Sequence, residues 1–198
     1  MRNNCVKSCC KNNSNSEYIK WVLEVLGPVI LGSKPCEILN IPLKDNFRIN
    51  KLNEIKNFFS NCFKITYKII NTADGGTRVL FINKKSLSSI LNSKKCINFL
   101  KFIGYPSNYD LDYYIDILVG KLHSSKFPHE IGIFLGYPLK DVLGFMGYGK
   151  FKLSKVRYWK IYGDPEVSDI VCNKFLEDRN TMKHIIEFNS LDELKNVI

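Results

Sequence analysis

The sequence predicts an α+β fold, in which a small antiparallel sheet packs with several helices. Two observations support this class. Apolar and polar side chains alternate along one segment, a Gly-rich turn follows, and a second apolar run then returns, which predicts a β-hairpin over 63–70 and 77–82. Other segments place apolar residues three and four positions apart, which is the spacing of amphipathic helices.

The first residues are polar and rich in Asn, Ser and Lys, so we expect residues 1–16 to form a flexible tail. A chain of 198 residues is of the size of one ordinary domain, and residues 17–198 are expected to form a single α+β domain. Its first helix should begin at Glu17, and Gly27-Pro28 should end or kink it.

Beyond this helix the sequence predicts further helices and two short strands. One strand, Arg157–Tyr162, would join the hairpin sheet, and His184–Phe188 would form a last strand. The further helices are expected at 51–61, at 96–103, at 111–122 with Ser107 or Asn108 as the cap, after Asp164-Pro165, and after a capping box of Ser190 and Glu193.

A five-residue motif occurs twice, as FIGYP at 102–106 and as FLGYP at 134–138. Each glycine can take the left-handed conformation that ends a helix, and each proline can precede the next element. Two copies are too few for a repeat architecture, so we interpret them as two similar corners between helices.

The formal net charge is +10, from 29 Lys and Arg against 19 Asp and Glu, which at first suggests a nucleic-acid partner. However, 24 of the basic residues are Lys and only 5 are Arg, and they are dispersed along the chain. Because Arg is the residue suited to bidentate recognition of phosphate and bases, we expect nucleic-acid binding to be weak at most.

The sequence also bears on location and metals. It contains no apolar run long enough to span a membrane and no secretory signal pattern after Met1, and the seven cysteines are an odd number. A cytoplasmic location is therefore expected. Cys5, Cys9 and Cys10 supply one ligand fewer than a structural zinc site needs, so no metal site is predicted.

Three segments carry a family resemblance. They are GPVILGSKP at 27–35, FPHEIGIFLGYPLKDVLGF at 127–145 and WKIYGD at 159–164. With them the chain resembles an uncharacterised bacterial family catalogued as domain of unknown function 3793, from about residue 17 to its end. The resemblance implies a small intracellular protein and brings no established activity.

His129 and Glu130 are the candidate catalytic residues, because a His beside a carboxylate can act as an acid or base near neutral pH. Neighbouring helical residues point about 100° apart, however, and do not share a target. The zinc-protease motif is also absent, since Ile133 stands where its second His would be. A structural role for the pair is therefore favoured.

Lys34 follows Gly32-Ser33 and is a candidate for holding a phosphate or carboxylate, but a surface turn after a helix is the favoured explanation of this pattern. Trp159 and Tyr162 are expected to pack in the sheet, because aromatic residues favour strands. Tyr158, Lys160 and Tyr162 would share one face of a strand, and if that face is exposed they could stack a base or a flat ligand.

The favoured hypothesis is a ligand-binding or accessory protein without catalysis of its own. The partner would be a small anionic ligand or another protein, and no cofactor is indicated. The alternatives are an enzyme that uses His129 and Glu130 on a small molecule, and a weak nucleic-acid binder. The expected ligand-binding residues are Lys34, Tyr137, Trp159, Lys160 and Tyr162.

Overall fold

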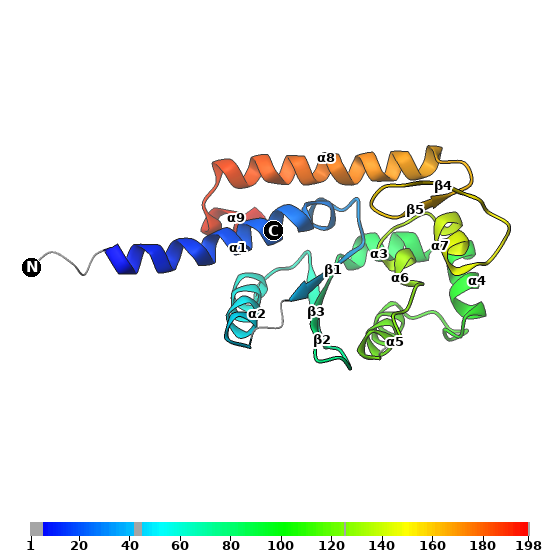
Figure 1. Cartoon of the computed structure of the whole chain (residues 1–198), viewed down its shortest axis with the longest axis horizontal. Helices are drawn as coiled ribbons and strands as arrows, with labels where there is room; N and C mark the ends of the chain where they lie inside the picture. The colour runs from blue at the N-terminus through cyan, green and yellow to red at the C-terminus, as the bar shows by residue number, and fades with distance from the viewer. Residues whose placement is uncertain (1–5, 42–44, 125, 198) are drawn as a thin grey trace, which may run out of the picture.

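The structure is a computed structural model that describes residues 6–41, 45–124 and 126–197 (Figure 1). It confirms the α+β class. The elements are α1 Val6–Leu31, β1 Cys36–Ile41, α2 Asp45–Phe59, β2 Thr66–Asn71, β3 Thr77–Ile82, α3 Lys84–Leu91, α4 Lys94–Phe102, α5 Leu111–His123, α6 Ile131–Phe134, α7 Leu139–Met146, β4 Leu153–Val156, β5 Lys160–Tyr162, α8 Glu166–Phe188 and α9 Leu191–Val197.

The larger sheet is antiparallel, with strand order β1-β3-β2. The predicted hairpin is confirmed as β2 and β3, in a register that places Tyr67 opposite Phe81. Because side chains alternate along a strand, the central strand β3 supplies both faces of the sheet. Val79 and Phe81 are buried on one face, and Leu80 and Ile82 are buried on the other.

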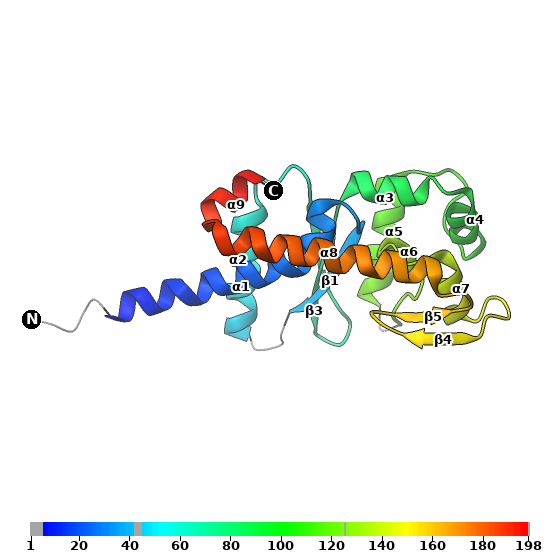
Figure 2. The ribbon, with the colours of Figure 1, turned by 90° about the horizontal axis from the view of Figure 1, so that it is seen from above.

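Helices cover both faces of this sheet. The first hydrophobic core joins one face to α1, α2, α8 and α9, and the second joins the other face to α3, α4, α5, α6 and α7. Figures 1 and 2 show these two helical groups on either side of the sheet, with the β4–β5 hairpin beside α7. Helix α8 begins beside α7 and the β4–β5 hairpin and runs back past the end of α1 to α9, so it spans both groups (Figures 1 and 2).

Helices α1 and α8 run antiparallel and side by side along much of their length (Figures 1 and 2). Gly27 permits this approach, since a Cβ atom there would lie 2.8 Å from the Met182 Cβ and 2.9 Å from the Asp178 carbonyl oxygen. The Arg179 guanidinium also pairs with the Glu24 carboxylate across the helices, at 2.9 Å.

The two FIGYP-like corners are confirmed as helix ends. Gly104 and Gly136 follow α4 and α6 with positive φ angles of 102° and 79°. In each corner the tyrosine N–H donates to the carbonyl five residues back, at 3.0 Å for Tyr105 and 2.9 Å for Tyr137. This pattern is the Schellman motif, which satisfies carbonyls that a helix end would otherwise leave unpaired.

Two predicted helix starts are also confirmed. The Ser190 and Glu193 capping box precedes α9, with the Ser190 N–H donating to Glu193 Oε2 at 2.7 Å and the Glu193 N–H donating to Ser190 Oγ at 3.3 Å. Helix α8 begins at Glu166, whose N–H donates to Asp164 Oδ1 at 3.1 Å. The cap of α5 is Asp110, not Ser107 or Asn108.

The strand prediction needs a correction. Of the predicted strand Arg157–Tyr162, only Lys160–Tyr162 forms a strand, β5, and it pairs with β4 in a separate two-stranded sheet. Tyr158 lies in the bend before β5, so it does not share a strand face with Lys160 and Tyr162 as predicted. The third strand of the larger sheet is β1, which the sequence did not predict. Polar residues Glu37 and Asn40 interrupt its apolar pattern, and pairing with β3, about 40 residues away in the chain, determines its conformation.

Two helix boundaries also differ from expectation. His184–Phe188 is not a strand but the end of α8, because Met182 and Ile186 are buried four residues apart on the side that packs in the first core. Helix α1 continues past Pro28 to Leu31, so Gly27-Pro28 does not end it.

Helix α1 begins at Val6 and not at Glu17, so residues 6–16 of the expected tail are helical. Residues 1–5 lie outside the described residues. The division into a tail and one domain stays a prediction. In the described part of the chain, no helix has the length and apolar character that crossing a membrane requires.

Candidate functional site

The three segments singled out in the sequence, 27–35, 127–145 and 158–164, meet where the end of α1, the α6–α7 pair and the β4–β5 hairpin approach α8. Two pockets open at this junction, and Tyr137 and Tyr158 line both of them. We call the one with His129, Phe145 and Trp159 in its lining the aromatic pocket, and the one with Lys34 and Arg179 in its lining the polar pocket.

The aromatic pocket encloses about 510 Å³, within the range of roughly 300–1,000 Å³ that is usual for small-molecule sites. Its lining is mostly apolar, and several aromatic side chains contribute to it. The lining residues are Phe127, His129, Ile131, Gly132, Leu135, Tyr137, Asp141, Val142, Phe145, Val156, Tyr158, Trp159 and Lys160.

Flat rings form the walls of the aromatic pocket. The Trp159 indole stacks on the Tyr137 ring, with the centroids 4.3 Å apart and the planes 18° from parallel. The His129 imidazole meets the Phe145 ring edge-on at 5.0 Å. Lys160 Nζ lies 5.5 Å from the centroid of the same Phe145 ring. Stacked and edge-on rings of this kind hold each other in fixed orientations.

Two glycines allow α6, α7 and β5 to pack closely around the aromatic pocket. A Cβ at Gly132 would lie 2.8 Å from Val142 Cγ2, and a Cβ at Gly144 would overlap the Tyr162 ring. Helix α7 therefore lies directly against β5. Tyr162 is consequently behind the wall of the pocket and does not line it.

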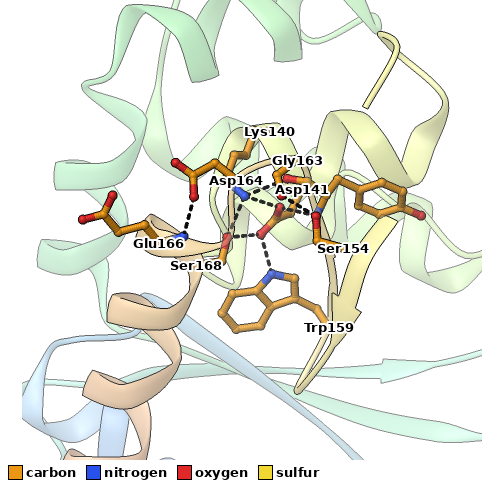
Figure 3. A network of polar contacts seen from close by, with 9 residues as sticks. Lys140, Asp141, Ser154, Trp159, Gly163, Asp164, Glu166 and Ser168 are labelled. Atoms are coloured by element: carbon orange, nitrogen blue, oxygen red, sulfur yellow. Dashed lines mark hydrogen bonds and ion pairs between the residues drawn. The ribbon is translucent and has the colours of Figure 1, made fainter. Parts of the chain in front are cut away.

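Asp141 is the centre of a hydrogen-bond network at the floor of the aromatic pocket (Figure 3). Its carboxylate is only 1% exposed and accepts four hydrogen bonds. Oδ2 accepts from Trp159 Nε1 at 2.7 Å and from Ser168 Oγ at 2.6 Å. Oδ1 accepts from the Tyr162 backbone N–H at 2.9 Å and from Lys140 Nζ at 2.8 Å.

This network ties α7, β5 and the first turn of α8 together. Burial alone would raise the pKa of the Asp141 carboxyl, but the hydrogen bonds from Lys140, Ser168, Trp159 and the Tyr162 backbone outweigh burial and hold that pKa below its usual range. Asp141 is therefore ionised at neutral pH, with its charge balanced by Lys140, and it fixes the indole of Trp159 in place.

The polar pocket is smaller, about 160 Å³, and lies between α1, β1 and α8. Lys34 is only 7% exposed, and its Nζ donates to Glu37 Oε2 at 2.6 Å while lying 5.7 Å from the Tyr137 ring centroid. Arg179 also lines the pocket and is paired with Glu24. Both cations that line this pocket therefore already have carboxylate partners.

His129 and Glu130 face different surroundings. His129 is exposed and lines the aromatic pocket, whereas Glu130 is 5% exposed and lies outside it. The Glu130 carboxylate accepts from Lys121 Nζ at 2.6 Å and from the Tyr105 hydroxyl at 3.5 Å. As expected for neighbouring residues at a helix start, the two side chains therefore point in different directions.

A family model described as a protein of unknown function, DUF3793, matches residues 22–195. The chain belongs to the DUF3793 family. No curated protein and no solved structure matches it. All the residues that line the two pockets lie within the matched region of this DUF3793 protein, which includes the Asp141 network.

The structure thus brings together most of the residues predicted from the sequence. His129, Tyr137, Trp159 and Lys160 line the aromatic pocket of this DUF3793 member, and Lys34 lines the polar pocket next to it. Glu130 and Tyr162 line neither pocket. Whether these residues bind a ligand stays a prediction at this point.

Several residues that line the aromatic pocket were not predicted from the sequence, among them Phe127, Asp141 and Phe145. All three lie in the 127–145 segment that carries the family resemblance. The two phenylalanines could have been noticed as the ends of that segment. Asp141 offered no separate sign, because an acidic residue in the first turn of a helix is common on exposed helices as well.

Among the residues whose placement is described, no group of three or more His, Cys, Asp or Glu is arranged to hold a metal ion. Cys5, Cys9 and Cys10 lie outside the part of the chain whose side chains the structure describes.

Proposed function

We propose that this DUF3793 protein binds a flat, largely apolar small molecule that carries a negative charge, and that it does so without catalysing a reaction. The observation that supports the proposal is the aromatic pocket itself. It has the volume of a small-molecule site, and its walls are rings held in fixed positions by stacking and by the Asp141 network. Flat aromatic molecules bind well between such surfaces.

The charges around the pocket favour an anion. Lys160 is exposed, lines the pocket and places its ammonium over the Phe145 ring. The carboxylate in the lining, Asp141, is already neutralised by Lys140 and accepts four hydrogen bonds. A ligand therefore meets the positive charge of Lys160, and a charge-assisted hydrogen bond to an anionic group is the favourable match.

The arrangement gives less support to catalysis. An acid–base pair works when both groups reach the same reacting atoms. Here Glu130 is buried against Lys121 and Tyr105, so it is not beside His129 in the pocket. Asp141 is held by its four donors. His129 then contributes a polar side chain to the lining of the binding pocket.

Two dyes test this proposal. Anilinonaphthalene sulfonate is a flat aromatic anion, and phenyl-naphthylamine is its uncharged counterpart. We expect each to bind once per chain, with an increase in dye fluorescence. Phe145→Ala should weaken both dyes by about tenfold because it removes apolar contact area. Lys160→Gln should weaken only the sulfonate, by about fivefold, since an exposed ion pair contributes about 1 kcal/mol or less.

Matched controls are available on α8. Phe188 is 83% exposed and Lys183 is exposed, and neither lines the pockets described above. Phe188→Ala and Lys183→Gln should leave both affinities unchanged. The proposal is wrong if neither dye binds, or if the affinities are the same in the Phe145 variant and in its control.

A further inference from the structure

A third opening shares no lining residue with the two pockets described above. It encloses about 720 Å³ between the end of α1, the start of α3 and the residues that precede β2. We call it the basic groove. Its lining residues are Ile30, Leu31, Gly32, Ser33, Pro35, Phe63, Lys64, Asn83, Lys84, Lys85, Ser86, Ser89 and Ile90.

The charge of the basic groove has one sign. Among the described residues that line the groove, three are lysines and none is Asp or Glu. Lys84 is paired with Asp112 of α5 at 2.5 Å, so its charge is partly balanced from outside the groove. Lys85 is exposed, and so is Lys64, which also has an interaction within the protein. Lysines with no carboxylate among the lining residues favour an anion, and phosphate is the anion that lysine commonly binds.

Phe63 provides a second, different feature of the basic groove. Its side chain is 99% exposed, and it lies next to Lys64 just before the hairpin. A phenylalanine this exposed contributes nothing to either core of the protein. Its ring is available on both faces, and an exposed aromatic ring beside a basic groove is the arrangement by which proteins stack nucleic-acid bases.

The floor of the basic groove is fixed by hydrogen bonds between α1 and α3. Asn83 Nδ2 donates to the Val29 carbonyl at 2.9 Å, and Ser86 Oγ donates to the Gly32 carbonyl at 2.8 Å. The sequence singled out Gly32-Ser33-Lys34 as a possible phosphate-holding turn. In the structure Gly32 and Ser33 line this groove, whereas Lys34 belongs to the polar pocket.

We infer that the basic groove binds a phosphate attached to a flat ring, as in a nucleoside phosphate, with Lys64 and Lys85 contacting the phosphate and Phe63 stacking on the ring. Both a free nucleotide and one nucleotide of a single-stranded nucleic acid carry a phosphate attached to a flat ring. This inference is independent of the ligand proposed for the aromatic pocket.

The test uses the full chain and two fluorescent probes, methylanthraniloyl-ADP and a short labelled oligothymidylate, at fixed low salt. We expect Phe63→Ala to weaken binding by about tenfold, the effect typical of losing one stacked base. Lys85→Gln should weaken binding severalfold. Because Phe63 and Lys85 are exposed, both variants should fold like the parent protein, and Phe188→Ala and Lys183→Gln serve as matched controls.

The outcomes separate the sources and the alternatives. Tighter binding of the nucleotide supports a free nucleotide, and tighter binding of the oligothymidylate with a steep salt dependence supports a single strand. The inference is overturned if neither probe binds, or if binding is unchanged in both the Phe63 and Lys85 variants. Neither variant touches the aromatic pocket, so dye binding there should stay intact and report separately on the proposed function.

Discussion

Replacing Asp141 by alanine is expected to lower the free energy of unfolding by about 3–5 kcal/mol, the range seen when one partner of a buried ion pair is removed. The variant would leave the Lys140 ammonium, the Trp159 indole N–H and the Ser168 hydroxyl without their shared acceptor. It would also release β5 from α7, since the Tyr162 N–H donates to the same carboxylate. Urea denaturation followed by circular dichroism measures the change.

Asp116→Ala is the matched control. Asp116 also pairs with a lysine, Lys68 at 3.1 Å, but its side chain is 60% exposed. Removing an exposed pair changes stability by about 1 kcal/mol or less. If Asp141→Ala were no more destabilising than Asp116→Ala, the Asp141 network would not hold α7, β5 and α8 together.

The pH dependence of stability follows from the same residue. The native pKa of Asp141 is lowered relative to the unfolded chain, so its contribution to stability is fully present above the ordinary Asp pKa of about 4. The contribution is lost as the pH falls through the lowered native pKa. The stability difference between wild type and Asp141→Ala should therefore shrink on acidification below about pH 4.

Gly27→Ala is expected to destabilise the protein by about 1–3 kcal/mol, as overpacking of a filled contact does. The new methyl group would meet the Met182 Cβ at 2.8 Å and the Asp178 carbonyl oxygen at 2.9 Å. The latter belongs to the backbone of α8, so α1 and α8 would have to move apart along a long contact. Thermal and urea unfolding of the variant measure the loss.

Gly120→Ala is the matched control, because Gly120 is also inside a helix but nothing lies within 4 Å of the added Cβ. Replacing a helical Gly by Ala without new contacts stabilises a protein by roughly 0.5–1 kcal/mol. The two substitutions should therefore have opposite signs. Stabilisation by Gly27→Ala would mean that α1 and α8 are not in the close contact described here.

The parts of the fold that the sequence predicted correctly depend on local patterns. The hairpin follows from alternation around Asp74-Gly75-Gly76, and the corners at Gly104 and Gly136 follow from glycines that take positive φ angles. The capping box before α9 depends on two residues three positions apart, Ser190 and Glu193. In each case neighbouring residues determine the structure, so the sequence alone contains the information.

The parts that the sequence did not predict depend on contacts between distant residues. Strand β1 forms because Cys36–Ile41 pairs with β3, and His184–Phe188 is helical because α8 packs against α1. The burial of Asp141 likewise requires donors from 18 to 27 residues further along the chain, Trp159, Tyr162 and Ser168. Local propensity is a weak predictor wherever tertiary packing decides the outcome.

The segments that carry the family resemblance are the ones that build the candidate site. Gly136 has a positive φ angle, and a Cβ there would lie 2.6 Å from Pro35 Cδ, so it joins the 127–145 segment to the 27–35 segment. Asp141, in the 127–145 segment, accepts a hydrogen bond from Trp159 in the 159–164 segment and so joins these two segments. The resemblance therefore marks a junction of three segments, and the aromatic pocket opens at that junction.

The most direct test of a ligand in the aromatic pocket uses the two tryptophans of the chain. Trp159 lines the pocket with its indole N–H bonded to Asp141, whereas Trp21 is 46% exposed on α1 and does not line it. Their indole N–H groups give two signals in a proton–nitrogen correlation spectrum, and Trp21→Phe assigns them.

During titration with anilinonaphthalene sulfonate, the Trp159 signal should shift and saturate at one equivalent while the Trp21 signal stays in place. Saturable binding of the dye with no change in the Trp159 signal would contradict the account.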